Sequence, residues 1–175
     1  MDLVYTIGHS SRSLEEFLEA LLSLGIRLLV DVRRWPSSRR YPHFNRGNLE
    51  SALSRHGIKY LWAPELGGYR RFGVDVEDRG IATCFESEGF RAYATYILTS
   101  PTAKEALLRL EELARGSRTA IMCSERVPWR CHRKIIADWL LSRGFRVIHI
   151  IELGRLVEHR PTRCAVVEEG RLTYI

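Results

Sequence analysis

The segments LVYTIGHS (residues 3–10), SLEEFLEALLSLG (residues 13–25) and IRLLVDV (residues 26–32) decide the fold. The first is a short apolar run that ends at Gly8-His9-Ser10, which is typical of a strand leading into a turn. The second begins with the Ser13 and Glu16 spacing of a capping box and continues with an apolar stripe at helical spacing. The third is almost continuously apolar, as expected for a strand covered on both faces. This strand–helix–strand order predicts a parallel sheet with right-handed crossovers.

The rest of the chain continues the alternation of strands and helices. Irregular segments are expected at residues 34–45 and 63–86. Further strands are expected at 58–62, 119–122 and 147–151, and further helices around 49–53 and at 90–98, 103–113 and 133–141. The tail, residues 164–175, has the pattern of a β-hairpin. We therefore expect one three-layer α/β domain over residues 1–175, with a mainly parallel central sheet of about five strands, helices on both faces and a C-terminal hairpin.

The composition is that of a folded domain with an excess of arginine. The net charge is +6, and lysine occurs only at Lys59, Lys104 and Lys134. Arginine presents a planar fork of donors that suits phosphate or carboxylate, although a genome rich in arginine codons would give the same excess. The chain has no glutamine, only two asparagines and few methionines, which is one signal of a thermophilic source.

The N-terminus and the cysteines indicate the cellular compartment of the protein. The first residues carry acid where a signal peptide carries base, and no apolar stretch is long enough to span a bilayer. We therefore expect a cytoplasmic protein with no membrane partner. That setting favours reduced thiols at Cys84, Cys123, Cys131 and Cys164, whereas a hyperthermophilic source would leave a structural disulfide open.

Three expected strand ends carry residues whose side chains can act as nucleophiles, acids or bases. They are Gly8-His9-Ser10, Asp31-Val32-Arg33 and Cys123-Ser124-Glu125. In an open parallel sheet the strands point the same way, and ligands bind outside their carboxyl ends. The sequence therefore predicts that His9, Asp31, Cys123 and Glu125 lie along one edge as the catalytic candidates.

Three of these four candidates have a chemical role and a plainer alternative. Cys123 precedes a loop that enters a helix at Cys131-His132-Arg133, where cations and the helix N-terminus favour a nucleophilic thiolate; it could also be a buried structural cysteine. His9 is suited to proton transfer or only to bonding the backbone of a tight turn. Asp31 would orient other groups, and it needs a partner such as Arg33 or His9 to offset its burial; that pairing could also be purely structural.

A second set of residues is suited to holding an anion. We expect this role for Ser10, Arg33, Arg39, Arg130, His132 and Arg133. The segment from Arg33 to Arg46 also contains Trp35 and Tyr41, so it either binds nucleic acid through phosphate and base stacking or closes over a small anionic substrate. His132 with the nearby thiols could also ligate a metal, but tetrahedral zinc normally shows tighter paired spacing, so no metal or cofactor is expected.

Several motifs together resemble one family. They are Thr6-Ile7-Gly8-His9-Ser10, Asp31-Val32-Arg33 with Pro36-Ser37-Ser38-Arg39, Gly57-Ile58-Lys59-Tyr60, Pro64-Glu65-Leu66-Gly67-Gly68, and Cys123-Ser124-Glu125 followed by Cys131-His132-Arg133. In order and spacing this set closely resembles the domain of unknown function 488 family, from Val4 to about Leu153. The resemblance implies a cytosolic α/β domain of prokaryotes and brings no settled activity.

A more distant similarity is to the rhodaneses. Asp31-Val32-Arg33, the later cysteine loop and a helix that ends in Leu141-Ser142-Arg143-Gly144-Phe145 follow the order of a rhodanese. The chain departs from that pattern in the loop after Cys123 and in the insert at residues 63–86. Sulfur transfer is therefore a hypothesis at the level of the fold alone.

Three functions follow as expectations from the sequence. The first is a thiol-dependent transferase or hydrolase that acts on an anionic, phosphate-bearing substrate related to nucleotides or nucleic acid. The second is a basic nucleic-acid-binding module without catalysis, and the third is rhodanese-like sulfur transfer. A purely structural or regulatory role is the remaining alternative.

Overall fold

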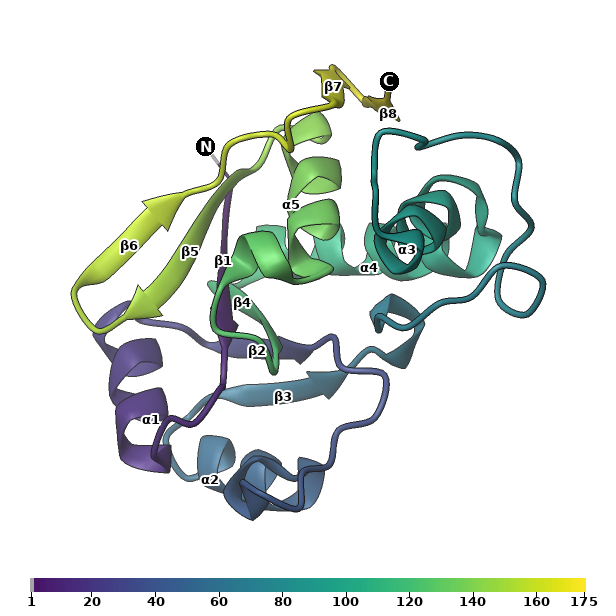
Figure 1. Cartoon of the computed structure of the whole chain (residues 1–175). Helices are drawn as coiled ribbons and strands as arrows, with labels where there is room; N and C mark the ends of the chain where they lie inside the picture. Colours follow the sequence, from purple (N-terminus) through teal and green to yellow (C-terminus); the bar gives the residue numbers. More distant parts are fainter. Residues whose placement is uncertain (1) are drawn as a thin grey trace.

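A six-stranded sheet forms the centre of the computed structural model, which describes residues 2–175 (Figure 1). The strand order is β3-β2-β4-β1-β5-β6, and every neighbouring pair is parallel except β5 with β6. The strands are β1 (Leu3–Gly8), β2 (Leu28–Asp31), β3 (Lys59–Trp62), β4 (Thr119–Cys123), β5 (Arg146–Glu152) and β6 (Arg155–Glu158). Strands β2, β4 and β1 are adjacent, so their carboxyl ends meet at one edge.

Helices cover both faces of this sheet. Helices α1 (Leu14–Ser23) and α2 (Arg46–Ser54) lie on one face, and α3 (Glu88–Thr99), α4 (Pro101–Gly116) and α5 (Arg133–Ser142) lie on the other (Figure 1). Successive residues of a strand point to opposite faces, and this alternation divides the core in two. In β1, Val4 packs with the layer of α3 to α5, whereas Tyr5 packs with the layer of α1 and α2.

The first crossover forms as its sequence predicts. Ser13 caps α1 in a reciprocal capping box with Glu16, and Phe17 and Leu21 on the apolar stripe are buried. Gly25 follows the helix with a φ of +69°, a left-handed conformation that glycine adopts without a steric penalty.

A C-terminal hairpin packs against α5 and is tied to the domain in two ways. It comprises β7 (Ala165–Glu168) and β8 (Arg171–Tyr174). A disulfide joins Cys164, just before the hairpin, to Cys84 in the long segment before α3. A buried polar chain then runs inward from Tyr174, whose hydroxyl donates to Asp138, and continues through the side chains of His159, His149 and Thr6.

The predicted fold class is therefore confirmed, with two additions. Strand β6 was not expected, because it is a short, largely exposed edge strand without an apolar run. The disulfide resolves the alternative that was left open for Cys84 and Cys164, and it departs from the expectation of reduced thiols for these two cysteines. In residues 2–175 no helix is both long and apolar enough to cross a membrane.

Candidate active site

The three strand ends converge as predicted. The backbone N–H of His9 donates to the carbonyl of Cys123 at 2.9 Å, and that of Val32 donates to the carbonyl of Met122, also at 2.9 Å. The loop after β4 then packs directly on Gly8, where a Cβ atom would lie 1.8 Å from the carbonyl oxygen of Glu125. Only glycine at residue 8 allows the cysteine loop to take this position.

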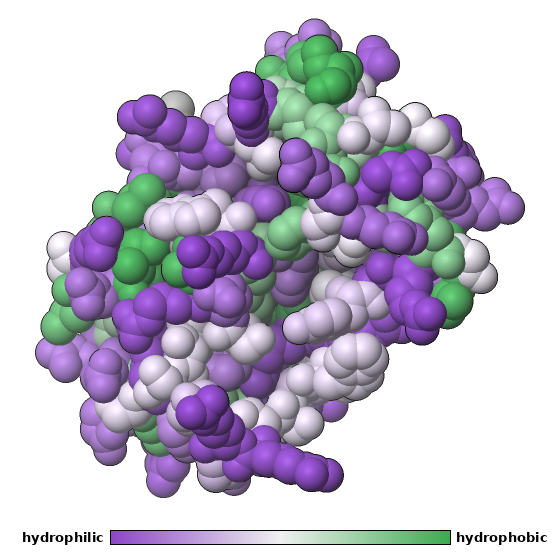
Figure 2. Space-filling model, viewed as in Figure 1, coloured by the Kyte–Doolittle hydropathy of each residue, from purple (hydrophilic) through white to green (hydrophobic). Residues whose placement is uncertain are grey.

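A cavity of about 800 Å³ opens at this edge of the sheet. The face of the molecule in Figure 2 is mostly hydrophilic and is hollowed near its centre. Seven of the ten residues predicted from sequence line the cavity, namely His9, Ser10, Arg33, Cys123, Glu125, Arg130 and His132. The lining also includes Cys131, serine hydroxyls from the segment after β2 and several aromatic rings, so it offers polar and apolar surfaces together.

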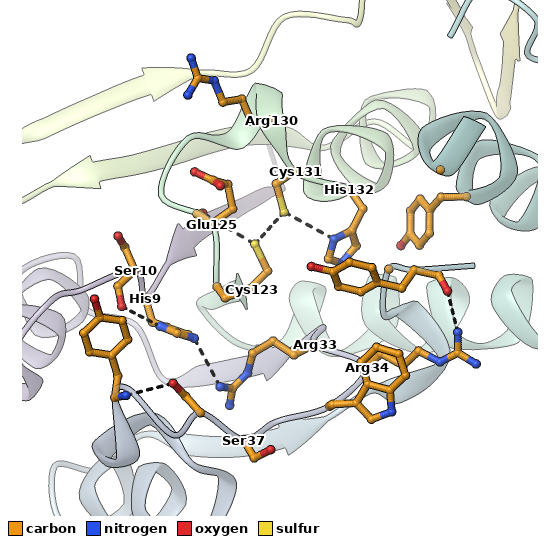
Figure 3. A pocket seen from close by; sticks show the side chains of 18 of the residues that line it. His9, Ser10, Arg33, Arg34, Ser37, Cys123, Glu125, Arg130, Cys131 and His132 are labelled. Atoms are coloured by element: carbon orange, nitrogen blue, oxygen red, sulfur yellow. Dashed lines mark hydrogen bonds between the residues drawn. The ribbon is translucent and has the colours of Figure 1, made fainter. Parts of the chain in front are cut away.

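The two free cysteines face each other in the wall of the cavity (Figure 3). Cys123 is the last residue of β4, and Cys131 follows the 3₁₀ turn Pro128–Arg130, one residue before the cap of α5. Their Sγ atoms are 2.7 Å apart, and both residues are buried. The Sγ of Cys131 also accepts the first free N–H of the helix, that of Arg133, at 3.5 Å.

The surroundings of the two thiols drive their pKa values in opposite directions. Burial raises the pKa of Cys123, and the hydrogen bond to Cys131 together with the negative charge there raises it further. Burial alone would also raise the pKa of Cys131, but the hydrogen bond from Cys123 and the charge and hydrogen bond of His132 lower it well below the usual range, with a further contribution from the charge of Arg133. The thiolate is therefore favoured at Cys131, whereas the sequence suggested Cys123.

His132 is oriented by its far nitrogen. Its Nε2 donates to the carbonyl of Val32 at 3.0 Å, and this bond leaves Nδ1 facing the Sγ of Cys131 at 3.5 Å. The ring lies edge-on to Tyr93 with a centroid separation of 5.0 Å. Gly68 passes close behind it, since a Cβ there would be 3.0 Å from Nδ1.

The carboxylate predicted at the end of β2 lies beneath the cavity and does not line it. Asp31 is fully buried and accepts two bonds from the guanidinium of Arg33, at 2.9 and 2.7 Å. The hydroxyl of Tyr60 donates a third bond at 2.6 Å. Arg33 thus satisfies the buried charge of Asp31, and the pair holds the guanidinium against His9.

His9 is fixed as a neutral imidazole. Its ring stacks on Phe44 at 4.5 Å, Nδ1 donates to the carbonyl of Ser10 at 3.0 Å, and Nε2 faces Nη1 of Arg33 at 3.4 Å. Burial, followed by the charge of Arg33, lowers the pKa of His9 to about 4. Ser10 has a φ of +47°, a strained conformation of the kind that often occurs at functional sites.

Two buried arginines donate to backbone carbonyls around the site, and one of them, Arg133, bonds the cysteine loop. Nη2 of Arg133 donates to the carbonyls of Glu125 and Arg126 at 2.8 and 3.3 Å, while its Nε and Nη1 have no hydrogen-bond partner in the described chain. Arg12 donates from Nε to the carbonyl of Gly8 at 2.9 Å and from Nη2 to the carbonyl of Ile151. Arg133 therefore positions the loop and does not line the cavity.

The rim of the cavity carries an exposed aromatic pair. Trp35 and Tyr69 are 62% and 76% exposed, and their ring centroids are 5.8 Å apart. The guanidinium of Arg34 lies 5.1 Å from the centre of the Trp35 ring and donates to the carbonyl of Tyr69 at 2.8 Å. Arg34 and Arg40 also line the cavity.

The remaining predicted residues take different places. Arg39 is exposed and does not line the cavity, and Arg130 lines it although its side chain points away from the thiols (Figure 3). The Glu125 carboxylate accepts the N–H of Val127 at 3.1 Å and so closes the loop on itself. A thiolate at Cys131 was not predicted from the sequence, although the position of Cys131 beside His132 and before a helix is the signal that indicates it. No group of three or more potential metal-ligating side chains occurs in residues 2–175.

The chain matches one protein family. The model of the family described as "Domain of unknown function DUF488" matches residues 13–140, which is well over half of the chain. No curated protein and no solved structure matches the chain. The family match covers less than the resemblance seen in the motifs, but it contains the cysteine loop and most of the cavity lining.

Proposed function

Because the chain belongs to the DUF488 family, whose description assigns no activity, we propose a function from the site itself. The protein is an enzyme that binds an anionic, phosphate-bearing substrate related to nucleotides or nucleic acid and attacks it with a cysteine thiolate. One observation carries this proposal. The thiolate-favouring Cys131 lies at the N-terminus of α5, beside a second thiol, in the wall of a cavity that is also lined by arginines.

Cys131 is the nucleophile in this scheme, and its neighbours set its reactivity. A thiolate next to a cation and a helix N-terminus is stable at neutral pH and remains a good nucleophile. Cys123 donates a hydrogen bond to it, and His132 faces it from the other side. His9 contributes as a neutral acceptor and not as an acid, since its pKa is about 4.

The anion is held by groups whose donors are free to face the cavity. Arg40 and the hydroxyls of Ser37 and Ser38 come from the segment after β2, whereas the guanidinium of Arg34 at the rim is paired with Asp75 and bonds the carbonyl of Tyr69. Arg33 is less available, because Asp31 already occupies its Nε and Nη2. Guanidinium and hydroxyl donors together suit the oxygens of a phosphate group.

The aromatic rim favours a nucleotide over a simple phosphate ester. Trp35 and Tyr69 present large exposed ring surfaces next to the arginines. Stacking a base on an aromatic ring contributes about 1–3 kcal/mol and tolerates any base. A phosphate bound in the cavity and a base stacked on the rim would place a nucleotide across its mouth.

The test combines binding with product detection. The full chain is incubated with nucleoside mono-, di- and triphosphates and with single-stranded DNA and RNA, and products are separated by chromatography. We expect turnover that is lost in Cys131→Ser while substrate binding is retained. Trp35→Ala should weaken binding roughly tenfold, the effect of one lost stacking contact, whereas Trp129→Ala should not, because Trp129 is exposed but lies outside the cavity lining. Turnover that survives Cys131→Ser would remove the thiolate from the mechanism.

A nucleic-acid-binding module without catalysis is the second candidate, and the exposed aromatic and basic rim favours it. It predicts binding of single strands that weakens steeply with salt and is unchanged in Cys131→Ser.

Sulfur transfer would use the same thiolate, and it predicts a persulfide on Cys131 after incubation with thiosulfate. Peptide mass spectrometry detects that added sulfur atom directly.

A further inference from the structure

The sulfur atoms of Cys123 and Cys131 lie closer together than a single nucleophilic thiolate requires. Their sulfur atoms are 2.7 Å apart, compared with about 2.05 Å for a covalent disulfide bond. Both thiols are free, both are buried, and both line the same cavity. A small approach of the two sulfurs would therefore allow a bond to form between them.

Both cysteines are fixed by the structure around them. Cys123 ends a buried strand, and its carbonyl accepts the N–H of His9. The loop between the cysteines is held by Arg133, which donates to the carbonyls of Glu125 and Arg126, and by its packing against Gly8. The contact between the two sulfurs is thus enforced by backbone anchors on each side.

The two thiols also differ in chemical character. Cys131 accepts a hydrogen bond from the N–H of Arg133 and faces His132. Cys123, at the end of β4, lies among buried apolar residues. In a dithiol pair the thiolate reacts first with an external group, and the neighbouring thiol then resolves the product. This asymmetry assigns the first step to Cys131 and the second to Cys123.

We propose that Cys131 and Cys123 form a redox-active dithiol that a peroxide oxidises reversibly to an intramolecular disulfide. The thiolate of Cys131 attacks one peroxide oxygen, the O–O bond breaks, and Cys131 becomes a sulfenic acid. The other oxygen leaves as hydroxide and takes up from solvent the proton that the Cys131 thiol had released, which gives the first water molecule. The sulfur of Cys123 then attacks the sulfur of Cys131, and the hydroxide that leaves takes the proton of Cys123 to form water. The two thiols supply the two electrons that reduce hydrogen peroxide to two molecules of water.

This inference goes beyond the proposed function because it needs only the two thiols and a small oxidant. If Cys131 is also the nucleophile of the proposed enzyme, the disulfide removes its thiolate and stops turnover until a dithiol reductant restores it. The redox reaction and the activity are measured separately, so one can fail without the other.

Peptide mapping tests the proposal on the wild-type chain. Trypsin cuts after Arg118, Arg126, Arg130 and Arg133, so Cys123 falls in peptide 119–126 and Cys131 in peptide 131–133. The native protein is treated with a dithiol reductant, desalted, exposed to one equivalent of hydrogen peroxide, blocked with iodoacetamide and digested without reduction. We expect peptides 119–126 and 131–133 to become linked, and a second treatment with the dithiol to separate them.

The Cys84–Cys164 disulfide is an internal reference in the same digest. It links peptide 80–91 to peptide 164–171, and this link reports whether the structural disulfide has survived the first treatment with dithiol. In Cys123→Ser the sulfenic acid of Cys131 should persist and be captured by dimedone. In Cys131→Ser, Cys123 should be oxidised at least about tenfold more slowly than Cys131, as expected for a protonated thiol.

Three results would overturn the proposal. One is oxidation of Cys131 to sulfinic acid in the wild type while Cys123 is recovered alkylated. Another is full alkylation of both cysteines after peroxide, and the third is a link from either of them to Cys84 or Cys164.

Discussion

At the residue scale, the site is built on buried charges that are satisfied in pairs. Asp31 is completely buried, and its charge is tolerated there because Arg33 and Tyr60 donate hydrogen bonds to both of its carboxylate oxygens. His9 lies against Arg33 on one side and Phe44 on the other, and this position keeps its imidazole neutral. Stability and reactivity at this edge therefore depend on the same few side chains.

The first prediction concerns Asp31. Tyr60→Phe removes one hydrogen bond to a charged group and should lower the free energy of unfolding by about 2 kcal/mol. Asp31→Asn leaves Arg33 buried without its counter-charge and should cost roughly 3–5 kcal/mol. Urea denaturation monitored by circular dichroism measures both. Equal costs for the two variants would contradict the ion pair as the main partner of Asp31.

The second prediction concerns pH. Burial lowers the pKa of His9 from its ordinary 6.5 to about 4, and burial followed by the charge of His159 lowers that of His149 to about 3. Between these values and pH 6.5 the unfolded chain binds protons that the folded chain does not. The free energy of unfolding should therefore fall by several kcal/mol as the pH drops from 6.5 to 4.

Histidine ring resonances followed by NMR identify the two groups directly. Both should stay neutral down to about pH 5. A midpoint near 6.5 for either ring would contradict the burial that the structure assigns to it.

At the element scale, the cysteine loop is positioned by a glycine and by a helix. Gly8→Ala would bring a Cβ within 1.8 Å of the carbonyl of Glu125, so the loop would have to move. We expect a loss of stability of at least about 2 kcal/mol, in the range of overpacking in a rigid site. Gly47→Ala in α2 is the matched control, since nothing lies within 4 Å of its added Cβ and alanine favours a helix. A Gly8→Ala variant as stable as Gly47→Ala would contradict the close packing of the loop.

Also at this scale, much of the site follows from local sequence patterns and part of it does not. The strand ends were predictable because apolar runs locate β1, β2 and β4, and parallel strands share a carboxyl edge. The capping box of α1 was predictable for the same local reason. In contrast, the thiolate at Cys131 depends on the orientation of His132 and on a contact with Cys123, and neither can be read from spacing.

Other features depend on contacts between residues that are distant in sequence. The chain from Tyr174 through Asp138 and His159 to His149 joins four elements or loops, and none of its members stands in a motif. The aromatic pair at the rim has the same origin, because Trp35 and Tyr69 come from the two irregular segments. Arg39, next to Arg40 in sequence, points elsewhere, since a loop has no periodicity from which to predict direction.

At the scale of the whole molecule, the Cys84–Cys164 disulfide ties the long segment before α3 to the C-terminal hairpin. Its two cysteines are 80 residues apart. Closing so long a loop in the unfolded chain should stabilise the protein by about 4 kcal/mol in the chain-entropy account. The Cys84→Ser, Cys164→Ser double variant should therefore unfold at a lower urea concentration, with Cys123 and Cys131 unchanged in alkylation rate. A double variant as stable as the wild type would contradict a structural role for this bond.

The two free thiols of the cavity are unequal, because the thiolate is favoured at Cys131 and disfavoured at Cys123. This difference is tested by the alkylation rates of Cys123 and Cys131, measured against pH on the native protein and read from their separate tryptic peptides. We expect Cys131 to react fast with a midpoint well below the ~8.5 of a free thiol, while Cys123 reacts slowly up to high pH. If Cys123 reacts first, or if neither thiol reacts until the protein unfolds, Cys131 does not carry the thiolate of this site.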